Sequence, residues 1–181
     1  MAKIWPVYEG KEPTEGGPWA SIPALEAVEL FDLRPDDYVS DLKETPRFGN
    51  SDRDLRYEGH KHLVVEIERR EARQTNLKPG FYRSRSTPDE ARRLLIGQAL
   101  AAELGRENFV RLELEPTIDS QGHEALKLTV VIAPNATQNI QGEEVLNALV
   151  ATQGRLLEMR DDRMPIIEYA TEAELVQDGA P

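Results

Sequence analysis

The sequence predicts an α+β protein with a single, mostly antiparallel sheet packed by two main helices and a loop-rich N-terminal half. Two observations predict this class. Residues 88–104 and 142–158 place apolar side chains at helical spacing, whereas the segments around them alternate apolar and polar residues as strands do. The C-terminal half therefore has the order helix, strand, strand, helix, strand, which is typical of helices layered on a sheet.

The first long helix is expected to begin after Thr87 and to end at Leu104. Thr87-Pro88-Asp89-Glu90 has the pattern of a capping box, in which the Thr and Glu side chains satisfy free backbone N–H groups. Gly105 follows as a residue that readily adopts the left-handed conformation found just after a helix.

A hairpin is expected next in the chain. Residues 110–114 and 126–132 alternate apolar with polar side chains, and the segment 116–123 between them is rich in turn-forming residues. The helix 142–158 and a short β-like run at 165–170 complete the C-terminal half.

The domain organisation is expected to have three parts. Residues 1–86 form an irregular arm with short helices and one or two strands, packed on the same domain as an α+β core at 87–170. Within the arm, a short helix is expected at 24–32, and a strand at 62–68 is expected to join the core sheet. Residues 171–181 are expected to form a short helical turn and a frayed tail.

The composition excludes several classes of protein. The 181 residues contain no Cys, so disulfide scaffolds, Cys-ligated zinc and thiol nucleophiles are absent. The apolar run at 128–133 is too short to cross a bilayer, and no secretory signal begins the sequence, so a cytoplasmic protein is expected. The net charge of −11 disfavours general binding to nucleic acid or to a membrane surface.

Recognised motifs for catalysis and cofactors are missing. The sequence has no phosphate-binding loop, no dinucleotide fingerprint, no His-Glu-x-x-His and no Gly-x-Ser-x-Gly. The order of the C-terminal elements suggests a KH-like RNA module, but the Gly-x-x-G loop of that module is absent, so we reject it. No cofactor is expected, and a non-enzymatic protein is favoured.

The clearest anomaly is a basic segment at 69–93. It holds eight Lys and Arg against three Asp and Glu, a local charge of +5 in a chain whose total is −11. Because the planar guanidinium group pairs well with carboxylates, this segregation favours an interaction protein that binds an acidic protein partner or a second copy of itself. The candidate binding residues are Arg47, Arg69, Arg70, Arg73, Arg83 and Arg85, with the aromatic side chains of Tyr82 and Trp19.

The alternative is a metal-dependent enzyme that processes nucleic acid or handles phosphate. Asp54, Glu66 and Glu68 have a spacing reminiscent of nucleases that hold Mg²⁺ with an Asp and a Glu-x-Lys, although here a Glu stands in place of the Lys. His60 and His62 lie on one face of a strand as weak metal candidates, but a metal needs at least three placed ligands, so no metal site is predicted.

Overall fold

The computed structural model describes residues 1–7, 18–41 and 62–178, so the candidates Arg47, Asp54 and His60 lie outside the described residues. The chain divides into two compact units. The first comprises Met1–Arg92 with Glu158–Asp161, and the second comprises Arg93–Leu157 with Asp162–Pro181.

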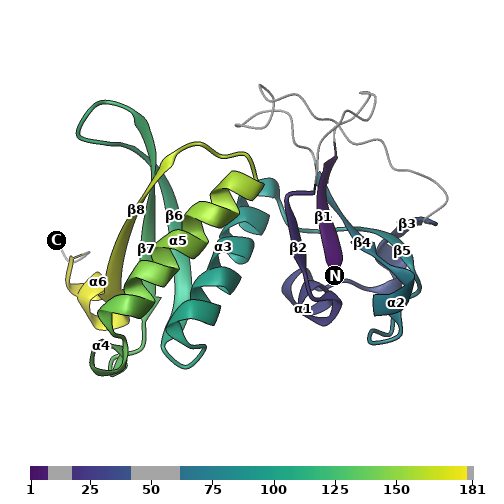
Figure 1. The fold of residues 1–181 in the computed structure, drawn as a ribbon, viewed down its shortest axis with the longest axis horizontal. Helices are drawn as coiled ribbons and strands as arrows, with labels where there is room; N and C mark the ends of the chain where they lie inside the picture. The colour runs from purple at the N-terminus through teal and green to yellow at the C-terminus, as the bar shows by residue number, and fades with distance from the viewer. Residues whose placement is uncertain (8–17, 42–61, 179–181) are drawn as a thin grey trace. The chain divides into compact units, whose positions relative to one another are not determined.

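The α+β class is confirmed, because helices and strands are mixed along the chain (Figure 1). The described elements are β1 (Ala2–Val7), β2 (Ala20–Ile22), α1 (Ala24–Leu30), the 3₁₀ turn η1 (Pro35–Asp37), β3 (Tyr38–Ser40), β4 (His62–Ile67), α2 (Arg69–Ala72), β5 (Gly80–Arg83), α3 (Pro88–Leu104), β6 (Phe109–Ile118), β7 (Glu124–Ile132), α4 (Ala136–Asn139), α5 (Gly142–Glu158), β8 (Met164–Thr171) and α6 (Glu172–Asp178).

The first unit contains a five-stranded antiparallel sheet in the order β2-β1-β4-β5-β3. Alternate residues of β1 and β4, among them Ile4, Leu63 and Val65, are fully buried, which explains the period-two pattern of these segments. The expectation that the strand at 62–68 joins the C-terminal sheet is therefore wrong. The strands form two sheets rather than one, because alternation reveals a strand but not the strand with which it pairs.

The second unit contains a three-stranded sheet in the order β6-β7-β8, with the helices α3 and α5 on one side of it (Figure 1). The predicted order helix, strand, strand, helix, strand is present. β6 and β7 pair antiparallel, but β7 and β8 pair parallel, because α5 carries the chain back between them. α3 packs closely on β6, since a Cβ added to Gly97 would lie 3.4 Å from Cζ of Phe109.

The ends of the predicted elements follow from local chemistry. The Thr87 hydroxyl accepts a hydrogen bond from the backbone N–H of Glu90 at 3.2 Å, and Gly105 ends α3 with a φ of +88°. In the hairpin turn, the Asp119 carboxylate accepts hydrogen bonds from the backbone N–H groups of Gln121 and His123, each at 2.8 Å. These contacts fix the two ends of α3 and the turn between β6 and β7.

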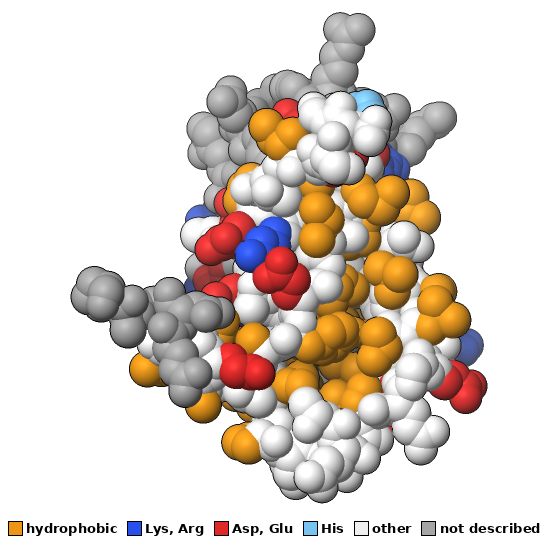
Figure 2. Space-filling view, turned by 90° about the vertical axis from the view of Figure 1, so that its left-hand side faces the viewer, with side chains coloured by type: hydrophobic (Ala, Val, Ile, Leu, Met, Phe, Trp, Pro, Cys, Tyr) orange, Lys and Arg blue, Asp and Glu red, His pale blue; other side chains and the backbone are white. Residues whose placement is uncertain are grey.

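Hydrophobic side chains cover much of the face shown in Figure 2, and charged side chains gather there in only a few places. This is the side of the second unit on which Figure 1 shows β8 and α6. Exposed large apolar residues of this unit include Ile118, Leu146, Val150, Leu157, Met164 and Val176.

Candidate functional site

Both aromatic candidates are core residues. Trp19 and Tyr82 are each 1% exposed. The Tyr82 hydroxyl donates a hydrogen bond to the backbone carbonyl oxygen of Lys78 at 2.7 Å, and burial raises the pKa of this hydroxyl. Neither ring is available to contact a partner, so the two residues stabilise the first unit instead.

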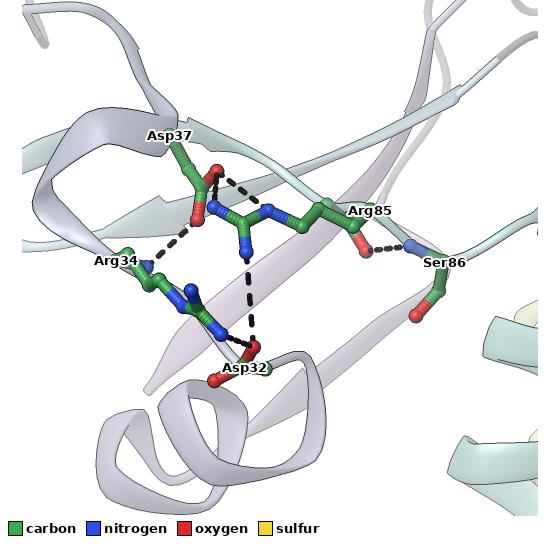
Figure 3. Close-up of polar contacts among 6 residues, drawn as sticks. Asp32, Arg34, Asp37, Arg85 and Ser86 are labelled. Carbon is green, nitrogen blue, oxygen red and sulfur yellow. Dashed lines mark hydrogen bonds and ion pairs between the residues drawn. The ribbon is translucent and has the colours of Figure 1, made fainter.

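Arg85 is paired within its own unit (Figure 3). Its Nη2 and Nε atoms donate to Oδ1 of Asp37 at 2.9 and 3.1 Å, and its Nη1 lies 3.8 Å from Oδ2 of Asp32. Arg34 donates to both carboxylates, from its side chain to Asp32 and from its backbone N–H to Asp37. This cluster leaves Arg85 with an internal role, because its guanidinium group already meets two carboxylates.

Three of the candidate arginines remain together, with Arg69 and Arg70 on α2 and Arg73 at its C-terminal cap. Arg69, Arg70 and Arg73 are exposed and line a hollow of about 330 Å³. The spacing i, i+1 and i+4 places all three within about 100° of one side of the helix, since each residue adds 100° of rotation. Arg83 is also exposed, in β5, but it does not line this hollow.

The carboxylates beside these arginines contact other cations. Oε1 of Glu68 lies 2.6 Å from Nζ of Lys3, and Oε1 of Glu71 lies 3.0 Å from the α-amino nitrogen of Met1. We call Arg69, Arg70 and Arg73 the α2 arginine cluster; none of its guanidinium groups forms an ion pair with a carboxylate of the described residues.

Two carboxylates of the alternative metal hypothesis, those of Glu66 and Glu68, lie close to the ammonium group of a lysine. Lys3 pairs with Glu66 across β1 and β4, and its Nζ lies 3.9 Å from Oε1 of Glu66 and 2.6 Å from Oε1 of Glu68. Glu66 also accepts a hydrogen bond from Nε1 of Trp5 at 2.9 Å. Over residues 1–7, 18–41 and 62–178, no group of three His, Asp or Glu side chains is arranged to hold a metal ion.

The contact of Lys3 with Glu66 and Glu68 was not predicted from the sequence. Lys3 lies 63 positions before Glu66, and no local pattern reports pairing between strands so far apart. His62 is the first residue of β4.

We expect Lys3→Met to raise the pKa of Glu68 toward its ordinary value. That pKa is lowered chiefly because Lys3 donates a hydrogen bond to the carboxylate, with a smaller electrostatic contribution from Arg70. Because the pKa of Glu68 is lower in the folded than in the unfolded chain, the ionised carboxylate stabilises the fold. This contribution is fully present above the unfolded pKa of about 4.3 and is lost as the pH falls through the folded pKa. A ¹³C NMR titration of side-chain carboxyl groups measures the change.

Glu174 is the internal control for this titration. Its pKa is lowered by hydrogen bonds from the backbone and side chain of Thr171, in the second unit, so Lys3→Met should leave it unchanged. An unchanged Glu68 pKa in the variant would contradict the role given to Lys3.

The RNA-binding loop of a KH-like module is absent from the second unit. Ile140 and Gln141 alone join α4 to α5, so there is no Gly-x-x-G. Glu143 and Glu144 stand in the first turn of α5, where they would repel a phosphate. In the described residues, no helix combines the length and the apolar character that crossing a bilayer requires.

Comparisons with known proteins returned nothing: no family model, no curated protein and no solved structure matches the chain.

Proposed function

We propose that this chain is a non-enzymatic interaction or accessory protein that binds an acidic protein partner through the α2 arginine cluster. The observation that supports this most is the clustering of three exposed guanidinium groups around one hollow, with no carboxylate from the described residues paired to them. A partner that supplies carboxylates would form charge-assisted hydrogen bonds with these guanidinium groups.

Carboxylates of a protein fit this surface better than a nucleic acid does. Affinity for a phosphate backbone grows with the number of phosphates contacted, and the cluster holds only three cations on a chain of net charge −11. A compact group of arginines suits a short acidic stretch, because each planar fork can bind one carboxylate with two parallel hydrogen bonds.

The alternative of a metal-dependent enzyme has less support. It rests on Asp54, which lies outside the described residues, and on Glu66 and Glu68, whose carboxylates already meet Lys3. A divalent cation would have to displace the ammonium group before it bound there.

The test compares Arg70→Glu with Arg83→Glu, which introduces the same charge change at an exposed arginine outside the hollow. The probe is a fluorescein-labelled peptide of ten glutamates, followed by fluorescence anisotropy. Loss of one charge-assisted pair is worth about 1.5–3 kcal/mol, so Arg70→Glu should weaken binding by about tenfold or more. Arg83→Glu should weaken it less than threefold, within the range of a surface charge.

Two results would overturn the proposal. The first is a wild-type protein that binds the glutamate peptide no better than a ten-residue glutamine peptide of the same label. The second is an equal loss of affinity in Arg70→Glu and Arg83→Glu, which would show a general effect of net charge.

A further inference from the structure

The helix α5 leaves several apolar side chains uncovered. Leu146, Val150 and Leu157 are 59%, 60% and 72% exposed. Ala148 and Leu156, on the packed side of the helix, are fully buried. Isolated exposed apolar residues are ordinary on a protein surface, but several in line on one helix indicate an interaction site.

The exposed side of α5 has the spacing at which one helix interlocks with another. At intervals of four, three and four residues, which is the repeat of a coiled-coil contact, it carries Leu146, Val150, Gln153 and Leu157. We call these four residues the α5 seam. The seam suits a helix with apolar side chains at the same intervals better than an extended strand, whose side chains alternate every second residue.

Acidic residues stand at both ends of the α5 seam. Each helical residue adds 100° of rotation, so Glu143 and Glu158 lie on the same flank of the seam, and both are exposed. They are fifteen residues apart, about 22 Å along the helix axis. Between them this flank holds Asn147 and Gly154, and a Cβ placed on Gly154 would meet no atom within 4 Å. The flank therefore has room for the backbone of a second helix and carries a carboxylate at each end.

The second unit is acidic as a whole. Residues 93–157 and 162–181 hold six Lys and Arg against thirteen Asp and Glu, a net charge of −7. The basic residue of α5, Arg155, donates from Nη2 to Oε1 of Gln98 at 3.1 Å, on the side of the helix away from the seam. The face around the seam therefore attracts a positively charged partner and repels a negatively charged one.

We propose that the α5 seam binds a basic amphipathic helix of another protein. Apolar side chains of that helix pack into the seam, and Lys or Arg side chains beside them meet Glu143 and Glu158. A second copy of this chain does not supply that charge. Two α5 helices packed antiparallel would bring Glu143 of one copy toward Glu158 of the other, and a parallel pair would bring each glutamate toward its counterpart. The α2 arginine cluster belongs to the first unit, so this proposal does not depend on the proposed function.

The first test measures the binding of a fluorescein-labelled helical peptide of Leu, Lys and Ala by fluorescence anisotropy. Its leucines stand at intervals of four, three and four residues, with lysines beside them. One control peptide has Glu in place of every Lys, and a second has the same residues rearranged so that no apolar face forms. The lysine peptide is expected to bind the wild-type chain at least about tenfold more tightly than either control, because only it matches both the seam and its acidic flank.

Matched variants of the chain locate the binding site. Leu146→Gln with Leu157→Gln is expected to weaken binding of the lysine peptide by at least about tenfold, because two apolar contacts are lost while glutamine preserves the helix. Leu25→Gln with Ile118→Gln makes a matching change at residues that are 49% and 68% exposed and lie outside the seam. This control should change the affinity by less than about twofold. Circular dichroism confirms that both variants fold.

Any of three results would rule out this occupant. One is a lysine peptide that binds no more tightly than the glutamate peptide or the rearranged peptide. Another is an equal loss of affinity in the seam variant and in its control, which would show attraction to the whole surface. The third is a wild-type dimer in sedimentation equilibrium that Leu146→Gln with Leu157→Gln dissociates, which would make a second copy the occupant of the seam.

Discussion

Replacement of Asp161 by alanine is expected to destabilise the first unit by about 3–5 kcal/mol, because it leaves a buried arginine without its buried counter-ion. Arg92 is 4% exposed, and its Nε lies 3.3 Å from Oδ2 of Asp161, which is itself buried. The guanidinium group also lies over the ring of Trp19, at 5.5 Å from the centroid, so it is held against the core on the side of Asp161.

Asp89 provides the matched control for this prediction. It contacts the same arginine at 2.7 Å, but its side chain is 91% exposed. Asp89→Ala should therefore cost less than about 1 kcal/mol, the usual value of an exposed ion pair. Urea denaturation of both variants, followed by tryptophan fluorescence, measures the two free energies of unfolding. Equal losses in the two variants would refute the assignment of Asp161 as the dominant partner.

The second large effect is expected from Leu128→Ala, at about 2–5 kcal/mol. Leu128 is fully buried in β7, the central strand of the second unit, with Leu114 beside it on β6 and Ile167 beside it on β8. Truncation removes apolar contacts to both neighbouring strands and leaves a cavity, since a packed interior collapses only partly.

Amide hydrogen exchange reports whether this loss falls on the second unit. Faster exchange is expected across β6 and β7 in Leu128→Ala, since the cavity lies between their side chains. Leu25→Ala makes the same chemical change at a residue of α1 that is 49% exposed, and it should cost less than about 1 kcal/mol. Unchanged protection of β6 and β7 in Leu128→Ala would contradict the central position given to this residue.

Local chemistry explains why the long helices were predictable. Thr87 and Gly105 act within a few residues of the helix that they bound, so the predicted end at Leu104 and the span 142–158 agree with the structure. The pairing of strands was not predictable in the same way. The partner of Lys3 is Glu66, and nothing near either residue in the sequence reports the other.

In the candidate site too, local features were predictable from the sequence and contacts between distant residues were not. Its basic segment was visible as an excess of charge, and three of its arginines line one hollow at α2 and its C-terminal cap. The contact between Arg85 and Asp37 spans 48 positions, and the burial of Trp19 and Tyr82 depends on the whole five-stranded sheet. Residue type alone separates neither an exposed arginine from a paired one nor a surface aromatic from a core aromatic.

The place of β1 in the first sheet constrains the order of events during synthesis. This strand leaves the ribosome before β2 and β4, yet it lies between them and cannot complete its pairing until residue 67 has emerged. A nascent chain halted before that point therefore presents the apolar residues of β1 with one long hydrogen-bonding edge unfilled. Such a chain is a natural client for a chaperone that shields extended apolar segments.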